Sequence, residues 1–175
     1  MRQRFFIIVG IAALALVASA AALAGTLTAT ATVTGASGVS VALPANPTLS
    51  STLDGSDQTV SYAPALAVLD ARGSGAGWNL TISATDFTSG SHTLPAGVLN
   101  SAAQACHAGS SCTAAVNAIS LPLTLGTTAA KFFNAAVNSG LGKVDVTPTV
   151  DVTVPGNAYA GTYTSTVTVA AVAGP

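Results

Sequence analysis

The chain has 175 residues, of which 50% are hydrophobic and only 6% are charged, and its formal net charge is −1. An average soluble domain carries roughly 25% charged residues. The five basic residues form no basic patch that would neutralise phosphates, which excludes a nucleic-acid-binding protein of the usual electrostatic kind. Good helix formers are scarce whereas Thr, Val, Ser and Gly abound, which argues against a helical bundle.

The N-terminus has the three-part layout of a secretory signal peptide. Arg2 and Arg4 precede an uncharged run over residues 5–24, which ends in two small-x-small cleavage patterns. We therefore predict a signal helix over residues 1–24 and one mature domain over residues 25–175, with no membrane segment after cleavage. Because the apolar run is longer than that of most signals, a retained membrane anchor is the alternative.

The first half of the mature chain alternates between apolar and polar residues. Residues 26–34 (TLTATATVT) have the period of a half-buried strand. Further strands are predicted over residues 39–43, over residues 59–69 with a break at Pro64, and over residues 78–86.

The middle of the chain is less regular. Residues 94–126 contain loops, both cysteines and one strand-like piece over residues 118–125. Residues 127–139 (TTAAKFFNAAVNS) are the one segment for which we expect a helix. Strands return over residues 143–154, where Pro148 is expected at a bulge, and over residues 159–171.

Seven or so short strands separated by Gly and Pro turns predict an all-β fold. We expect an antiparallel β-sandwich of immunoglobulin-like or Greek-key type with one short helix. Antiparallel pairing is favoured because the chain offers no helices to cover a parallel sheet. The rows of threonine predict a polar, uncharged outer face that can hydrogen-bond sugars or pack against another sheet.

Cys106 and Cys112 are expected to form a disulfide, because an exported chain with two closely spaced cysteines most often pairs them. Such a short loop contributes at most roughly 2–3 kcal/mol. A zinc site built on both cysteines and His107 would need a fourth ligand, for which His92 is the candidate. We predict the disulfide and no metal site.

Groups of catalytic residues are not evident in the sequence. No Gly-x-Ser-x-Gly elbow lies between a strand and a helix, and a glycosidase pair would have to consist of two Asp residues. Asp54 and Asp57 flank Gly55 and are expected to form a turn, with a weak calcium loop as the alternative. The sequence therefore predicts a protein that is not an enzyme and that uses no cofactor.

Trp78 is the single tryptophan and begins a predicted strand, in which it shares a face with Leu80 and Ile82. Two interpretations are open. Trp78 is either a core residue or an exposed platform that stacks on a sugar ring.

Two segments resemble the signatures of the WxL surface-protein domain. Residues 77–90 (GWNLTISATDFTSG) are similar to its first signature, a Trp-x-Leu at a strand start followed by a polar-alternating strand and a Phe. Residues 159–169 (YAGTYTSTVTV) are similar to its C-terminal signature. In that strand the family normally carries a second Trp-x-Leu, where this chain has Val169 and two alanines.

This resemblance implies an extracellular bacterial cell-surface protein that binds the cell wall non-covalently, through peptidoglycan or another wall polymer. Other surface proteins are further expected partners. We predict Trp78, Leu80, Tyr159 and Tyr163 as binding residues. The alternative is a structural subunit of an extracellular fibre or surface layer that self-associates, in which the strand over residues 26–34 pairs with a neighbour's edge.

Overall fold

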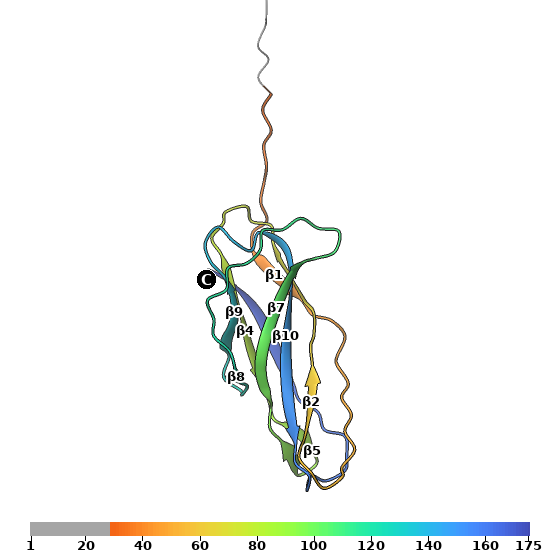
Figure 1. The fold of residues 1–175 in the computed structure, drawn as a ribbon. Helices are drawn as coiled ribbons and strands as arrows, with labels where there is room; N and C mark the ends of the chain where they lie inside the picture. Colours follow the sequence, from red (N-terminus) through yellow and green to blue (C-terminus); the bar gives the residue numbers. More distant parts are fainter. Residues whose placement is uncertain (1–28) are drawn as a thin grey trace, which may run out of the picture. The chain divides into compact units, whose positions relative to one another are not determined.

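The computed structural model describes residues 29–175, and within this range the chain is all β with no helix (Figure 1). The predicted signal helix lies outside the described residues. Residues 33–175 form one unit that holds every described strand. The strands are β1 (Val39–Ala42), β2 (Gln58–Tyr62), β3 (Leu66–Asp70), β4 (Trp78–Ala84), β5 (Phe87–Ser89), β6 (His92–Leu94), β7 (Val98–Cys106), β8 (Leu123–Thr124), β9 (Ala130–Ala135), β10 (Gly142–Val154) and β11 (Val167–Ala173).

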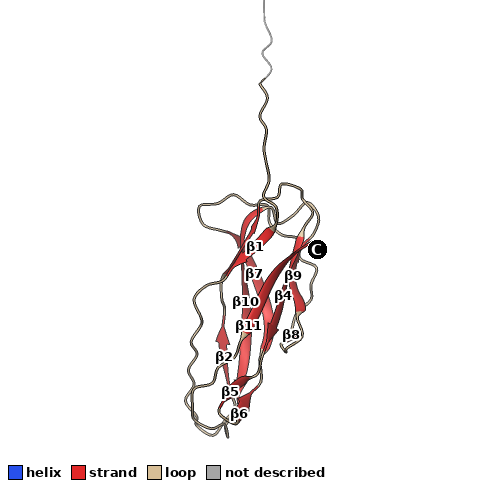
Figure 2. Cartoon of the chain, turned by 180° about the vertical axis from the view of Figure 1, so that it is seen from behind, coloured by secondary structure: helices blue, strands red, loops and turns tan. Residues whose placement is uncertain are grey.

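Two antiparallel sheets make up most of this unit, as the two views in Figures 1 and 2 show. The larger sheet has the order β1-β3-β10-β7-β8, and β2 pairs with β10 as well. The smaller sheet has the order β11-β4-β9, and β5 and β6 form a separate hairpin. Antiparallel pairing is confirmed, whereas immunoglobulin-like or Greek-key connectivity stays a prediction.

The long strand β10 organises the larger sheet because its 13 residues pair with three other strands. Its first part pairs with β3, its last part pairs with β2, and its other edge pairs with β7. Alternate valines of β10 are buried, as the period of two predicts. The predicted bulge at Pro148 is wrong, because Pro148 pairs in register with Ala102. The register shift lies between Thr149 and Val150, where Asn100 of β7 is the extra residue.

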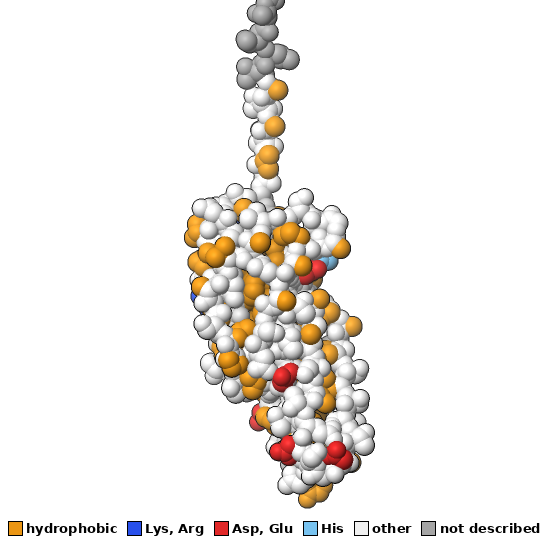
Figure 3. All heavy atoms as spheres, in the orientation of Figure 1, with side chains coloured by type: hydrophobic (Ala, Val, Ile, Leu, Met, Phe, Trp, Pro, Cys, Tyr) orange, Lys and Arg blue, Asp and Glu red, His pale blue; other side chains and the backbone are white. Residues whose placement is uncertain are grey.

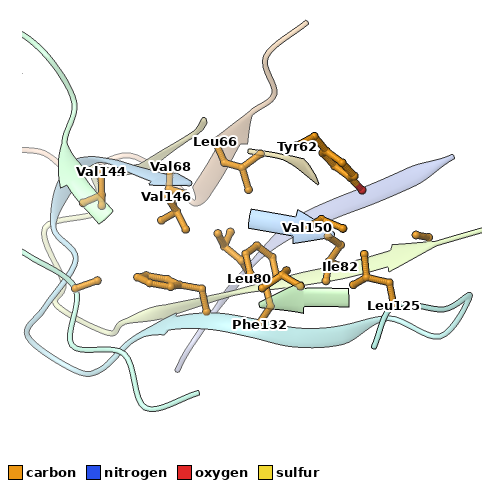
Figure 4. Close-up of a cluster of buried hydrophobic side chains, with 14 of the residues drawn as sticks. Tyr62, Leu66, Val68, Leu80, Ile82, Leu125, Phe132, Val144, Val146 and Val150 are labelled. Atoms are coloured by element: carbon orange, nitrogen blue, oxygen red, sulfur yellow. The ribbon is translucent and has the colours of Figure 1, made fainter. Parts of the chain in front are cut away.

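A single hydrophobic core receives side chains from both sheets (Figure 4). Leu66, Val146 and Val150 enter it from the larger sheet, and Leu80 and Phe132 enter it from the smaller one. Each of these five side chains is at most 1% exposed. Burial of a side chain of this size stabilises the fold by roughly 1.5–3 kcal/mol.

The predicted helix over residues 127–139 is wrong, because this segment contains strand β9, which pairs with β4. The register shifts between Leu80 and Thr81 of β4, so that Phe132 is an extra residue opposite the shift. Such a bulge allows the consecutive residues Phe132 and Phe133 to be buried together. The bulge removed the alternation that identifies a strand, and the alanines around it are typical of a helix.

The predicted strand over residues 26–34 is wrong for the part that the structure describes. Residues 29–36 are exposed and lie in no strand, although they alternate in sequence. A strand needs a partner for its backbone N–H and C=O groups, and this segment pairs with none of the described strands.

Three further segments differ from the prediction. Strand β7 lies in a region expected to be loops, because its residues are mostly small or polar and only Leu99 is fully buried. The strand-like piece over residues 118–125 is reduced to the two residues of β8. In the last predicted strand, residues 159–166 precede β11 and form a loop.

Candidate functional site

Trp78 is a core residue, so of the two interpretations that the sequence left open the structure supports the core residue and excludes the exposed sugar platform. Its side chain is 0% exposed, and its ring is stacked with that of Phe133 at a centroid distance of 5.9 Å. Its Nε1 donates a hydrogen bond of 2.9 Å to the carbonyl oxygen of Gly140. Gly140 has a φ of +67°, and a Cβ there would lie 2.7 Å from Nε1, so glycine is required at this contact.

Leu80 is also 0% exposed and lies two residues further along β4. In this structure neither Trp78 nor Leu80 reaches the surface to touch a ligand. Val169, which stands where the second Trp-x-Leu was expected, is half-buried and pairs with Ile82. These signature residues therefore build the packed face of the smaller sheet.

The other two predicted binding residues, Tyr159 and Tyr163, lie together in an open pocket. Its volume is about 300 Å³. The pocket is formed between the β5–β6 hairpin and the loop that follows β10. It is lined by Ser91, His92, Thr93, Leu94, Pro155, Asn157, Ala158, Tyr159 and Tyr163.

Local hydrogen bonds attach this loop to the hairpin. Thr88 and Thr164 exchange two backbone hydrogen bonds, of 2.9 and 3.0 Å. Tyr163 Oη donates a hydrogen bond of 2.9 Å to the carbonyl oxygen of Tyr159. The loop is thereby held against β5, and Figure 2 shows β5 and β6 at one end of the strands.

The pocket contains a stacked pair of aromatic side chains. The rings of His92 and Tyr159 have centroids 3.9 Å apart and an angle of 13° between their planes. Tyr159 remains 65% exposed, so much of its surface is available to a ligand. The sequence had suggested His92 as a candidate fourth zinc ligand and not as a neighbour of Tyr159. Its position beside Tyr159 was missed because the two residues lie 67 positions apart in the sequence and the β5–β6 hairpin was not predicted.

The polar side chains that line the pocket are hydroxyls, an amide and the imidazole of His92. Ser91, Thr93 and Asn157 offer hydroxyl and amide groups, and no Asp, Lys or Arg lines it. Charged side chains are also sparse on the face of the molecule drawn in Figure 3. A few polar groups beside exposed aromatic surface suit a neutral ligand with many hydroxyls, which is the chemistry of a sugar.

The predicted disulfide between Cys106 and Cys112 is present, with a Cα–Cα distance of 5.5 Å. The neighbouring His107 places Nδ1 2.7 Å from Asp145 Oδ1. Among residues 29–175, no group of three or more His, Cys, Asp or Glu side chains is placed to hold a metal ion. In the same range no helix has the length and hydropathy to cross a membrane.

The segment around Asp54 forms the expected turn. Asp54 Oδ1 accepts hydrogen bonds from the backbone N–H and the hydroxyl of Ser56, at 2.9 and 2.6 Å. These bonds lower the pKa of the Asp54 carboxyl below its usual value of 3.8. Asp57 Oδ1 accepts a hydrogen bond of 2.9 Å from the backbone N–H of Gly156, so both carboxylates serve local structure.

Residues 25–170 match the family model described as WxL domain surface cell wall-binding. Because the match spans most of the 175 residues, the chain belongs to the WxL domain family. Membership supports a place at the cell surface and binding to the cell wall. No curated protein and no solved structure matches the chain.

Proposed function

We propose that this protein is exported through an N-terminal signal and binds peptidoglycan, or another wall polymer, non-covalently and without catalysis. The observation that carries this proposal is the match of residues 25–170 to a surface cell wall-binding domain. We place the contact with the glycan in the pocket of His92, Tyr159 and Tyr163.

The chemistry of the pocket supports this placement. Tyr159 offers an exposed ring whose orientation is restrained by stacking on His92, so less conformational freedom is lost when a ligand binds. The hydroxyls of Ser91 and Thr93 lie in the same pocket and can exchange hydrogen bonds with sugar hydroxyls.

The pair His107–Asp145 supports a non-catalytic protein as well. In an activated hydrolase a nucleophile is hydrogen-bonded to the histidine that an aspartate orients. Within residues 29–175 no hydroxyl or thiol is hydrogen-bonded to the His107 ring, and the two nearby cysteines are bonded to each other. We therefore assign this pair a structural role.

Substitution of Tyr159 tests the proposed pocket. We expect Tyr159→Ala to weaken co-sedimentation with purified cell walls by up to roughly tenfold, since an aromatic contact is worth about 0.5–1.5 kcal/mol. Val137→Ala is the matched control, because Val137 is also well exposed, at 60%, but lies in the loop after β9, outside the pocket. Binding isotherms with isolated wall material measure both variants.

Two results would count against the proposal at different levels. If wild-type protein is not enriched on walls relative to an unrelated β domain, wall binding itself is wrong. If wild type binds and Tyr159→Ala binds equally well with unchanged thermal stability, the binding surface lies elsewhere on the domain.

A further inference from the structure

Strand β11 is an edge strand of the smaller sheet. Among the described strands it pairs with β4 alone, so its outer backbone groups have no strand partner. Its seven residues, VTVAAVA, contain no charged residue and no proline. Natural proteins usually blunt an exposed edge with charge, proline or a covering loop, because a bare edge accepts strands from other chains.

The core is incompletely covered beside this edge. Val167, Val169 and Ala171 of β11 pack against the core but are only half-buried. Val39 and Val41 of β1 are half-buried as well, and β1 lies near β11 without pairing with it. Additional apolar side chains at this edge would remove more of this surface from water, which stabilises by about 25 cal/mol per Å².

Near the N-terminal side of the described residues, the chain has a segment that resembles β11 in being uncharged and rich in Ala, Val and Thr. Residues 29–34 (ATATVT) are exposed and lie in no strand, and Val33 is 93% exposed. Their alternation would place Ala29, Ala31 and Val33 on one face and threonines on the other if the segment became a strand. The segment is uncharged, as is β11, so no electrostatic repulsion opposes their pairing.

We propose that residues 29–34 of one copy add as a strand to the β11 edge of a second copy. The added strand would place Ala29, Ala31 and Val33 toward the core of its neighbour and satisfy the free backbone groups of β11. Donor segment and acceptor edge are different surfaces, so the contact is head-to-tail and extends to a chain of copies. This assembly is independent of the pocket that we propose for the glycan.

Two single substitutions in the donor segment test the proposal. Val33→Asp puts a carboxylate on the face that would enter the neighbour, whereas Thr32→Asp puts the same charge on the opposite face. Both positions are exposed in the isolated chain, so neither variant is expected to unfold it. Residues 25–175, which exclude the apolar run of the predicted signal and retain every described residue, are compared by sedimentation velocity over a range of concentrations.

We expect wild type and Thr32→Asp to form species of increasing size with concentration. Val33→Asp should associate at least about tenfold more weakly, because its carboxylate would have to be buried. A wild type that remains monomeric at every concentration overturns the proposal, as does equal association of the two variants. If wild type is monomeric and Val33→Asp lowers its melting temperature more than Thr32→Asp, the segment covers its own β11, which also overturns association between copies.

Discussion

The two edge strands of the smaller sheet, β9 and β11, differ in what lies against their outer backbone groups. The β9 edge is hydrogen-bonded to the loop over residues 114–118, partly through side-chain amides. Among the described residues, β11 has no such bridging loop, and β1 lies near it without pairing. We call the first the bridged edge and the second the bare edge. Both edges belong to the same sheet and border the same core, so the comparison isolates what a covering loop contributes.

At the bridged edge, amide side chains make hydrogen bonds to backbone groups that a neighbouring strand would otherwise make. Asn134 Oδ1 accepts a hydrogen bond of 2.8 Å from the Ala118 N–H, and Asn117 Oδ1 accepts one of 2.9 Å from the Asn134 N–H. On the larger sheet, Gln104 of β7 exchanges two hydrogen bonds with the backbone of Ala115. The same loop therefore joins both sheets.

The two edges differ in whether their backbone groups are already hydrogen-bonded. At the bridged edge the amides satisfy backbone groups that would otherwise attract another strand. At the bare edge the corresponding backbone groups of β11 have no partner among the described strands. We infer that the bridged edge stabilises the domain and that the bare edge serves association.

The largest expected effect concerns the ion pair of Asp70, the last residue of β3, with Arg72 two residues further on. Arg72 Nη2 lies 2.8 Å from Asp70 Oδ2 and donates a bond of 2.6 Å to the carbonyl oxygen of Gly77. Gly77 in turn accepts a hydrogen bond from the Gly174 N–H, just past β11. Asp70→Asn should lower the free energy of unfolding by about 3 kcal/mol, because Arg72 is then left 11% exposed without its charged partner.

The same variant has a pH signature, which denaturant unfolding measured from pH 7 to pH 2 would detect. Hydrogen bonds from Arg72 lower the pKa of the Asp70 carboxyl below 3.8. A lowered folded pKa stabilises the protein above the unfolded pKa, and this stability is lost as the pH falls through the folded value. Wild type should lose its advantage over Asp70→Asn in that acid range. A constant difference at every pH would contradict this assignment.

An intermediate effect is expected at the bridged edge. Asn134→Ala removes the acceptor for the Ala118 N–H and should lower the free energy of unfolding by about 1–3 kcal/mol, because Asn134 is only 6% exposed. Hydrogen exchange should accelerate at Ala118. Asn100→Ala is the control, since its bond to Asp151 is exposed, and exposed polar contacts contribute little. Equal losses in the two variants would remove the distinction between the edges.

The sequence predicted those strands whose alternation is uninterrupted. The valines of β10 and the apolar residues of β4 identified both strands, because alternate residues face the core. Strand β9 was missed because its bulge buries Phe132 and Phe133 in succession. The segment over residues 26–34 shows the opposite case, since alternation alone does not supply a partner strand.

Of the two segments that form the candidate pocket, the sequence predicted binding residues only in the loop after β10 and none in the β5–β6 hairpin. Tyr159 and Tyr163 come from one continuous segment that resembles a family signature, whereas His92 lies on a hairpin whose short strands carry little pattern. Their proximity depends on the hydrogen bonds between Thr88 and Thr164, which local sequence does not reveal. The sequence did not decide whether Trp78 is buried, because a tryptophan at the start of a strand can face either the core or the solvent.

The smallest expected effect lies on the bare edge and compares the two faces of β11. Val172 points away from the core and is 46% exposed, so Val172→Ser should change the free energy of unfolding by less than about 0.5 kcal/mol. Val169 faces the core and is half-buried, so Val169→Ala should lower it by roughly 1 kcal/mol.

Measuring the unfolding of Val169→Ala and Val172→Ser at several protein concentrations tests whether another copy covers β11. If another copy covers the bare edge, the loss in Val169→Ala should grow with protein concentration, because binding to the folded state adds stability by mass action. Val172→Ser should show no such growth, since its side chain faces away from the core that the added strand would cover. Unfolding midpoints that are independent of concentration for both variants would indicate that β11 has no partner under those conditions.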